Sequence, residues 1–537
     1  MGASKMAVVA VVAAGVLVAG AGAALADVPA VMDAGTAATQ ARVSGGMIEG
    51  VTAGGVIAFK GVPFAAPSVG ANRWRAPQPV VPWTGVRKAA TYGPDCMQVP
   101  FPGDAAPLGV TPAEDCLYVN VWKPAKAAGG KLPVMVWIYG GGFVNGGSSP
   151  PEYDGSAFAR DGIVLVSFNY RVGNFGFFAH PALSAEQHGQ PLGNYAYLDQ
   201  VAALRWVQRN IAAFGGNPRN VTIFGESAGG MSVHALLLNP LARGLFQKAI
   251  IESGGGGAGL GSRPVSGGPD SAEAKGLALA AQFGVHGEDA AALQQLRAIP
   301  ADKLVDGLNM ASMGRAPNYV GGPVLDGTYE NGSPTTQYAR GRGARVPVMI
   351  GANSSDIGFM QAKTLDDLYD QFGPDAARAR EAYAAAPGTP VGAVAFQAGG
   401  DQMMVEPARR TAQLLSARGQ PVYEFRFSYV AESLRAKTPG APHATEIPFV
   451  FDTVAARYGK DLTPADEAAA RAMHAYWVAF ARTGKPEVPG QPQWPAYDAK
   501  QDMIMNFTTS GPVAQPDPWK QRLDLAQRFN DRKGGGR

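Results

Sequence analysis

Six nearly continuous apolar runs, rich in β-branched and aromatic side chains, recur along the chain and restrict its fold more than any other feature. They occupy residues 132–139, 162–170, 220–224, 248–253, 345–352 and 421–429. A run without polar alternation is typical of a strand buried on both faces, as strands of a parallel sheet are. Between the runs lie amphipathic helical patterns, the clearest at 195–216 and 463–486. Strand alternating with helix predicts an α/β protein with a mostly parallel central sheet and helices on both faces.

The N-terminal part has a different pattern. Residues 41–51 and 56–67 alternate apolar and polar side chains between glycine turns, which predicts a small antiparallel extension of the sheet. We find no internal repeat and no convincing linker, so we expect residues 27–537 to form a single domain. The glycine-rich stretch 254–271 is interpreted as a surface loop, with a lid as the alternative.

The first 26 residues form a separate unit. Lys5 precedes an apolar stretch that runs to Leu25, and the small-x-small sequence Ala24–Ala26 closes it. This arrangement predicts a secretory signal peptide that is cleaved after Ala26. The alternative is an uncleaved membrane anchor, because the stretch is about long enough to span a bilayer. We expect an exported protein, periplasmic or secreted, that has no membrane contact after cleavage.

Charge argues against a nucleic-acid partner. The formal net charge is +3, and loss of the signal peptide removes one lysine and no acid, which leaves +2. A chain of this size needs a basic face to bind a polyanion, and no basic block with interleaved aromatic residues is present. We expect a small-molecule partner instead. The oligomeric state cannot be read from the sequence.

The chain has two cysteines, Cys96 and Cys116. In an exported protein such a pair predicts one disulfide, which here closes a loop rich in proline and glycine. The alternative is a pair of free buried thiols. Neither cysteine has a second cysteine or a histidine at ligand spacing, so we expect no metal site.

The stretch FGESAGG at 224–230 places Ser227 between two glycines. The chain holds 70 glycines, so the five-residue pattern by itself is weak evidence, and an ordinary serine in a glycine-rich turn is the alternative. The context favours a nucleophile, because an apolar strand precedes the turn and a helical pattern follows it. The backbone N–H of Ala228 would then face a developing oxyanion. Gly141 and Gly142, which follow the run 132–139, are the expected further donors, with a simple turn as the alternative.

A serine nucleophile needs an acid and a base, and in chains with this turn the acid follows the serine and the histidine base follows the acid. His443 lies in a loop after the run 421–429 and is the predicted base, whereas His234 and His474 lie within helical patterns and are interpreted as structural. Asp356 follows the run 345–352 and is the predicted acid. A helix cap is the alternative reading of Asp356, and acids near 325–330 or 401 are alternative candidates. Glu226 is expected to support the site electrostatically.

These features together resemble the type-B carboxylesterase family, which includes the cholinesterases. The resemblance covers about residues 40 to 515 and is carried by GVPFAAP (61–67), EDCLYVNVW (114–122), WIYGGGF (137–143), NYRVGNFGF (169–177), the run 193–230, SG (253–254) and HATEIPFVF (443–451). It implies an α/β-hydrolase fold and ester hydrolysis through an acyl-enzyme, without a cofactor.

The resemblance also assigns roles to residues. Ser227 matches the family's nucleophile, His443 its base and Asp356 its acid; Gly141, Gly142 and Ala228 match its oxyanion hole, and Cys96 and Cys116 its first disulfide. Two positions depart from the family's usual pattern. Asp356 replaces a glutamate, so its loop must approach His443 more closely, and Tyr139 stands where many relatives have histidine.

The expected substrates are short to medium acyl or aryl esters, with a bulky ester or carbamate as the alternative. A quaternary amine is poorly supported, because residues 97–113 contain no Trp or Tyr to stack on it. A non-catalytic binding protein of the same family is a further alternative, which the presence of Ser227 and His443 disfavours.

Overall fold

The structure is a computed structural model that describes residues 39–104, 106–126, 131–187, 193–257, 263–327 and 332–534. The predicted signal peptide and its cleavage point lie outside the described residues, as does the middle of the stretch 254–271. Within the described part of the chain, no helix combines the length and apolar character that a membrane span requires.

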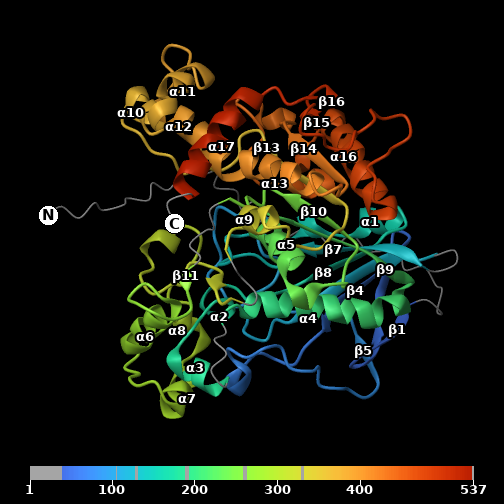
Figure 1. Cartoon of the computed structure of the whole chain (residues 1–537). Helices are drawn as coiled ribbons and strands as arrows, with labels where there is room; N and C mark the ends of the chain where they lie inside the picture. The colour runs from blue at the N-terminus through green and yellow to red at the C-terminus, as the bar shows by residue number, and fades with distance from the viewer. Residues whose placement is uncertain are drawn as a thin grey trace.

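An eleven-stranded sheet forms the centre of the molecule (Figure 1). Its spatial order is β16-β15-β14-β13-β10-β9-β7-β8-β6-β4-β3. The strands from β8 through β7, β9, β10, β13 and β14 to β15 pair in parallel, and the pairs at both edges are antiparallel. The bounds are β3 Val51–Ala53, β4 Val56–Pro63, β6 Tyr118–Pro124, β7 Leu132–Ile138, β8 Val164–Phe168, β9 Gly216–Glu226, β10 Lys248–Glu252, β13 Val348–Asn353, β14 Val422–Phe427, β15 Met503–Thr508 and β16 Gly511–Pro516.

All six apolar runs are strands of this sheet, and most of their residues are buried. Helices cover both of its faces: α4 (Tyr195–Asn210) and α5 (Ala228–Leu238) pack on one, and α1 (Ser156–Arg160) and α16 (Pro464–Thr483) on the other (Figure 1). The α/β prediction is confirmed. It held because a strand covered on both faces must be apolar at every position.

Both predicted helices form. The helix α16 begins with a capping box between Thr463 and Asp466 and is followed by Gly484 in the left-handed conformation, with φ of 80°. The pattern 195–216 gives α4 and then a tighter 3-10 turn, Ile211–Phe214, before the left-handed Gly215. Glycine at these stops relieves the steric cost that other residues have at positive φ.

The N-terminal strands divide between two sheets, and one of their pairs is parallel, whereas the sequence predicted a single antiparallel extension. β3 and β4 join the large sheet with antiparallel pairing, as expected. β1 (Gln40–Val43) and β2 (Gly46–Glu49) instead form a separate three-stranded sheet with β5 (Val86–Lys88), which pairs with β2 in parallel.

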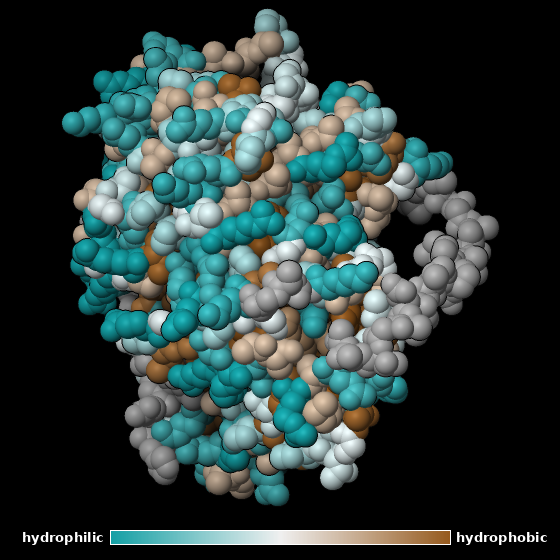
Figure 2. Space-filling view, turned by 90° about the vertical axis from the view of Figure 1, so that its right-hand side faces the viewer, coloured by the Kyte–Doolittle hydropathy of each residue, from teal (hydrophilic) through white to brown (hydrophobic). Residues whose placement is uncertain are grey.

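Two helical lobes extend from the sheet (Figure 1). One contains α6 (Ala272–Gln282), α7 (Ala290–Ala298) and α8 (Ala301–Leu304), and the other contains α10 (Leu365–Asp370), α11 (Ala376–Ala382) and α12 (Val391–Gly400). Each lobe has its own apolar cluster. Figure 2 shows a face on which hydrophilic residues predominate and hydrophobic ones lie in small separate groups.

Candidate active site

Ser227 lies in a strained turn between β9 and α5. Its φ of 55° and ψ of −119° are rare for a residue with a side chain, and such strain collects at functional positions. The flanking positions must be glycine, because a Cβ at either one would clash with neighbouring backbone atoms. A Cβ on Gly229 would lie 1.9 Å from the carbonyl oxygen of Ile138, and one on Gly225 would lie 2.6 Å from the same oxygen. The sequence Gly-x-Ser-x-Gly is therefore needed for β9 and α5 to pass so close to β7.

Three backbone N–H groups are available near this turn. Those of Gly141, Gly142 and Ala228 donate no hydrogen bond within the described residues. Gly140 joins the two loops, because a Cβ there would lie 3.0 Å from the Ser227 Cβ. Free donors on glycine, at positive φ of 106° for Gly141 and 63° for Gly142, can approach a substrate oxygen without a side chain in the way.

Buried polar contacts hold the glycine loop in place. The Tyr139 hydroxyl donates to the Tyr170 carbonyl at 2.8 Å, and the Tyr170 hydroxyl donates to the Tyr139 carbonyl at 2.7 Å. The two rings are stacked with centroids 4.3 Å apart. Tyr139 thus holds the glycine loop against the end of β8.

The predicted disulfide between Cys96 and Cys116 is present. The loop it closes also contacts the glycine loop, because Asn145 donates to the Gln98 side chain at 3.1 Å and to the Val99 carbonyl at 2.8 Å.

The structure brings Asp356 and His443 together. Asp356 Oδ1 lies 2.6 Å from His443 Nδ1. The other carboxylate oxygen accepts from the Ser253 hydroxyl at 2.7 Å and from the Asn353 N–H at 2.9 Å. The alternative acids have other partners: Asp401 is paired with Arg522, and Asp326 accepts from Asn194.

The surroundings favour a negative charge on Asp356 and a positive charge on His443. Burial opposes ionisation of Asp356. Attraction to His443 and hydrogen bonds with His443, Ser253 and Asn353 outweigh burial and lower the pKa of Asp356. Burial likewise opposes the imidazolium, but the attraction and hydrogen bond of Asp356, with Glu446, raise the pKa of His443. An ionised acid that orients a basic imidazole is the arrangement that general-base catalysis requires.

The Ser227 hydroxyl is not bonded to His443 in this conformation. It makes no side-chain hydrogen bond within the described residues. Glu226 Oε1 lies 3.1 Å from His443 Nε2, although the geometry is not that of a hydrogen bond. Catalytic hydrogen bonds are often long before substrate binds and tighten afterwards.

The remaining candidate histidines have structural surroundings. His234 is fully buried, and its Nδ1 lies 3.0 Å from the Tyr338 hydroxyl. Burial lowers its pKa to about 4. His474 is buried on α16, with Nδ1 2.7 Å from the Val450 carbonyl. Neither contacts Ser227 or Asp356.

Several residues of this region were not predicted. Ser253 belongs to the SG motif, and its hydroxyl donates to Asp356. Met310 and Met313 lie beside Gly142, where a Cβ would be 3.3 Å from the Met313 sulfur and 3.8 Å from Met310 Cγ. The Met310 N–H donates to the Asn145 side chain at 2.9 Å, which ties this segment to the glycine loop. No local pattern marks these methionines, because only the fold brings them to the loop.

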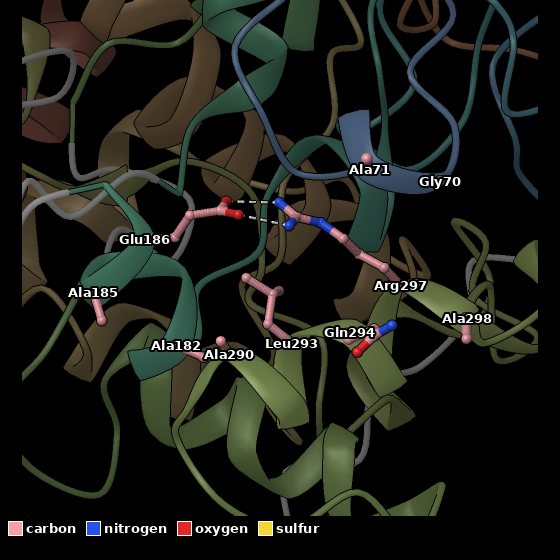
Figure 3. A pocket seen from close by; sticks show the side chains of 10 residues that line it. All are labelled: Gly70, Ala71, Ala182, Ala185, Glu186, Ala290, Leu293, Gln294, Arg297 and Ala298. Atoms are coloured by element: carbon pink, nitrogen blue, oxygen red, sulfur yellow. Dashed lines mark hydrogen bonds and ion pairs between the residues drawn. The ribbon is translucent and has the colours of Figure 1, made fainter.

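A pocket of about 620 Å³ is lined by none of these residues. It lies between α7, η1 (Gly70–Asn72) and α3 (Pro181–Glu186), and Figure 3 shows that small alanine side chains make up much of its wall. Arg297 binds Glu186 through two hydrogen bonds of 2.8 Å, and hydrogen bonds from Arg297 and Arg75 lower the Glu186 pKa to about 2. Because its charges are already paired, we assign this pocket no part in the reaction.

Comparisons with known proteins identify the family of the chain. A model of the carboxylesterase family matches residues 37–386 and 390–524. The fumonisin B1 esterase of Sphingopyxis macrogoltabida is 36% identical over 478 residues, which cover 86% of this chain and 85% of that protein. The para-nitrobenzyl esterase of Bacillus subtilis (strain 168) is 35% identical over 488 residues, which cover 86% and 93%.

Solved structures give the same result. The carboxylesterase of Geobacillus stearothermophilus has a TM-score of 0.76 at 35% identity, with 91% of this chain and 100% of that chain covered. A structure of a PNB esterase has a TM-score of 0.74 at 33% identity. The chain therefore belongs to the carboxylesterase family, has the α/β-hydrolase fold and is a serine ester hydrolase.

Proposed function

We propose that Ser227, His443 and Asp356 form the catalytic triad of this esterase, with Gly141, Gly142 and Ala228 as its oxyanion hole. The observation that carries the proposal is the strained Ser227 beside three N–H groups that have no partner in the described part of the chain, together with the 2.6 Å contact between Asp356 and His443.

The reaction follows from these positions. His443 Nε2 takes the hydroxyl proton of Ser227 as the serine oxygen attacks the ester carbonyl, and the N–H groups hold the tetrahedral oxyanion. The alcohol leaves with the proton from His443, and Ser227 remains as an acyl ester. Water then attacks that ester with His443 again as base, which releases the acid and restores the serine. Asp356 keeps the Nδ1 proton in place and stabilises the imidazolium.

We propose short to medium acyl or aryl esters as substrates. Met310 and Met313 supply flexible apolar surface beside Gly142, which suits a hydrocarbon substituent next to the ester carbonyl. The names of the relatives extend the range to larger esters. One 36% identical relative is a fumonisin B1 esterase and one 34% identical relative is a human cocaine esterase, so a bulky ester is the second candidate.

We also propose that the chain is exported as a single catalytic domain. The disulfide supports an oxidising compartment, because such bonds are rare in the cytosol. Sequencing the N-terminus of the mature protein from the producing cell tests the cleavage after Ala26.

The proposed chemistry is tested by hydrolysis of nitrophenyl esters of increasing acyl length, with the Ser227→Ala variant as the control. We expect turnover of the wild type and its loss in the variant, with an unchanged unfolding temperature. A fluorophosphonate should label the wild type at Ser227 alone. Wild-type rates in Ser227→Ala would rule out the nucleophile, and labelling without turnover of any member would point to the bulkier substrates.

A further inference from the structure

Glu252 is the last residue of β10 and lies beside the nucleophile turn. In the sheet it pairs in register with Glu226 of β9 on one side and with Gly351 of β13 on the other. Residues in register on neighbouring strands project from the same face, and the strands are about 4.8 Å apart. Two glutamates therefore lie side by side at the carboxyl end of the sheet, where like charges repel.

The surroundings of Glu252 do not support a charge. Its side chain is fully buried, Trp477 of α16 donates to Oε1 at 2.8 Å, and Oε2 has no hydrogen-bond partner among the residues that the structure describes. The ionisable groups around it are the carboxyl groups of Glu226 on β9 and Glu446 before α14 (Ile447–Val450). Within the described ranges, no Lys, Arg or His forms an ion pair with Glu252.

A buried carboxylate with one hydrogen bond and no cation is costly, so such a group keeps its proton. Burial raises the pKa of Glu252 to about 8, despite the hydrogen bond from Trp477. Burial and the neighbouring carboxyl groups also raise the pKa of Glu226 and of Glu446. The two members of the pair differ in one respect: Glu226 faces His443 Nε2 at 3.1 Å, whereas Glu252 faces an indole.

Glu252 also touches the nucleophile through its backbone. The Ser227 N–H donates to the Glu252 carbonyl at 2.9 Å. A negative charge on the Glu252 side chain would lie near a serine that becomes part of an anionic tetrahedral intermediate. In a buried site of low dielectric such a charge raises the energy of the transition state.

We propose that Glu252 is a positioning residue that acts in its neutral, protonated form: its carbonyl holds the Ser227 N–H, and its side chain places no negative charge beside the Ser227 turn. The inference rests on the proposed roles of Ser227 and His443. The inference adds to those roles, because ionisation of Glu252 would lower kcat/KM at alkaline pH, an effect that His443 and Asp356 do not produce.

The test is the pH profile of kcat/KM for a nitrophenyl ester, measured for wild type and Glu252→Gln. In the wild type kcat/KM should rise above pH 6.5 as His443 loses its proton, and fall again near pH 8 as Glu252 ionises. Glu252→Gln places a neutral amide with a similar acceptor opposite Trp477. We expect its kcat/KM at pH 7 to stay within about threefold of wild type. The fall near pH 8 should become smaller, because Glu252 no longer ionises and only Glu446, whose pKa is also raised to about 8, still does.

Glu424→Gln is the matched control. Glu424 is another buried glutamate of the same sheet, on β14, with a raised pKa and one oxygen that has no hydrogen-bond partner within the described ranges. Its charged neighbours are Asp517, Arg426, Asp502 and Arg409. This variant should keep the wild-type fall near pH 8. If its fall becomes smaller as well, the effect comes from overall stability and the assignment to Glu252 is wrong.

A second variant covers the case in which Glu252→Gln does not fold. Trp477→Phe removes the hydrogen bond that lowers the Glu252 pKa, so the alkaline fall should move to higher pH. An alkaline fall unchanged in either variant, or a loss of more than about tenfold at pH 7 in folded Glu252→Gln, would overturn the proposal. Ser227→Ala and fluorophosphonate labelling decide the triad separately, so the failure of one proposal is distinguishable from that of the other.

Discussion

At the scale of single residues, the short side chain of Asp356 has a visible compensation. An aspartate needs its loop closer to the histidine than a glutamate does, and backbone contacts draw the two loops together. The Ser355 N–H donates to the Ala441 carbonyl at 2.9 Å, and the Asn353 side chain donates to the Pro442 carbonyl at 2.7 Å. The acid loop thus pairs directly with the segment that carries His443.

Replacing Asp356 by Asn should lower kcat by about 10³- to 10⁴-fold, because an amide cannot fix the required tautomer or stabilise the imidazolium. Ser253→Ala should have a smaller effect, since it removes one of several hydrogen bonds to the carboxylate. Both are measured as kcat on a nitrophenyl ester, with circular dichroism as the check on folding. A wild-type kcat in Asp356→Asn would show that another residue is the acid of the triad.

At the scale of elements, the crossing of β9, α5 and β7 depends on glycine. The turn at Ser227 is tight because the backbone of Ile138 lies against both flanking glycines. The same closeness recurs after β10, where a Cβ on Gly254 would lie 2.8 Å from the Gly230 backbone. Helix α5 is thereby held between the ends of two strands, and its first N–H is held next to the glycine loop.

Gly229→Ala should therefore destabilise the protein and abolish turnover, because its Cβ would overlap the Ile138 carbonyl oxygen at 1.9 Å. Gly392→Ala is the matched control. Gly392 lies in α12 with open space around it, so alanine there should leave stability unchanged or raise it by up to about 1 kcal/mol through helix propensity. Thermal unfolding of both variants gives the comparison, and equal unfolding temperatures would contradict the steric argument.

At the scale of the whole molecule, the site is assembled from segments far apart in the sequence. The disulfide loop, the glycine loop and the Met310 segment meet at Asn145, which bonds to all three. The acid and histidine loops come from the other half of the sheet. A change that loosens one of these segments should therefore lower both the stability of the protein and its activity.

Removal of the disulfide by Cys96→Ser with Cys116→Ser should lower the free energy of unfolding by about 3 kcal/mol, from the entropy of a loop with a sequence separation of 20. Loss of the Gln98 and Val99 contacts should also lower kcat/KM, because Asn145 then holds the glycine loop less firmly. Urea unfolding and ester hydrolysis measure the two effects. A double variant with full stability would show that packing alone orders the loop.

The sequence alone determined the class of fold, the strands of the parallel core, the Ser227 turn and the disulfide. Each of these depends on local information: hydrophobic period, turn glycines and cysteine count. The order of Ser227, Asp356 and His443 along the chain narrowed the acid to a few candidates. All three candidates follow or flank regular elements, and only the structure shows that Asp356 contacts His443, whereas Asp326 contacts Asn194 and Asp401 contacts Arg522.

Only the tertiary structure decided the rest. The methionines beside Gly142 come from a segment outside the sheet, which only the fold brings to the glycine loop. The support of Asp356 by Ser253 and the pairing of Glu252 with Glu226 depend on strand order and register. Register is set by packing over the whole sheet, and a shift of one residue would turn each of these side chains to the other face. The neighbours of Glu252 lie far from it in the sequence, and only the folded sheet brings them together. The charge state of Glu252 therefore depends on the tertiary structure.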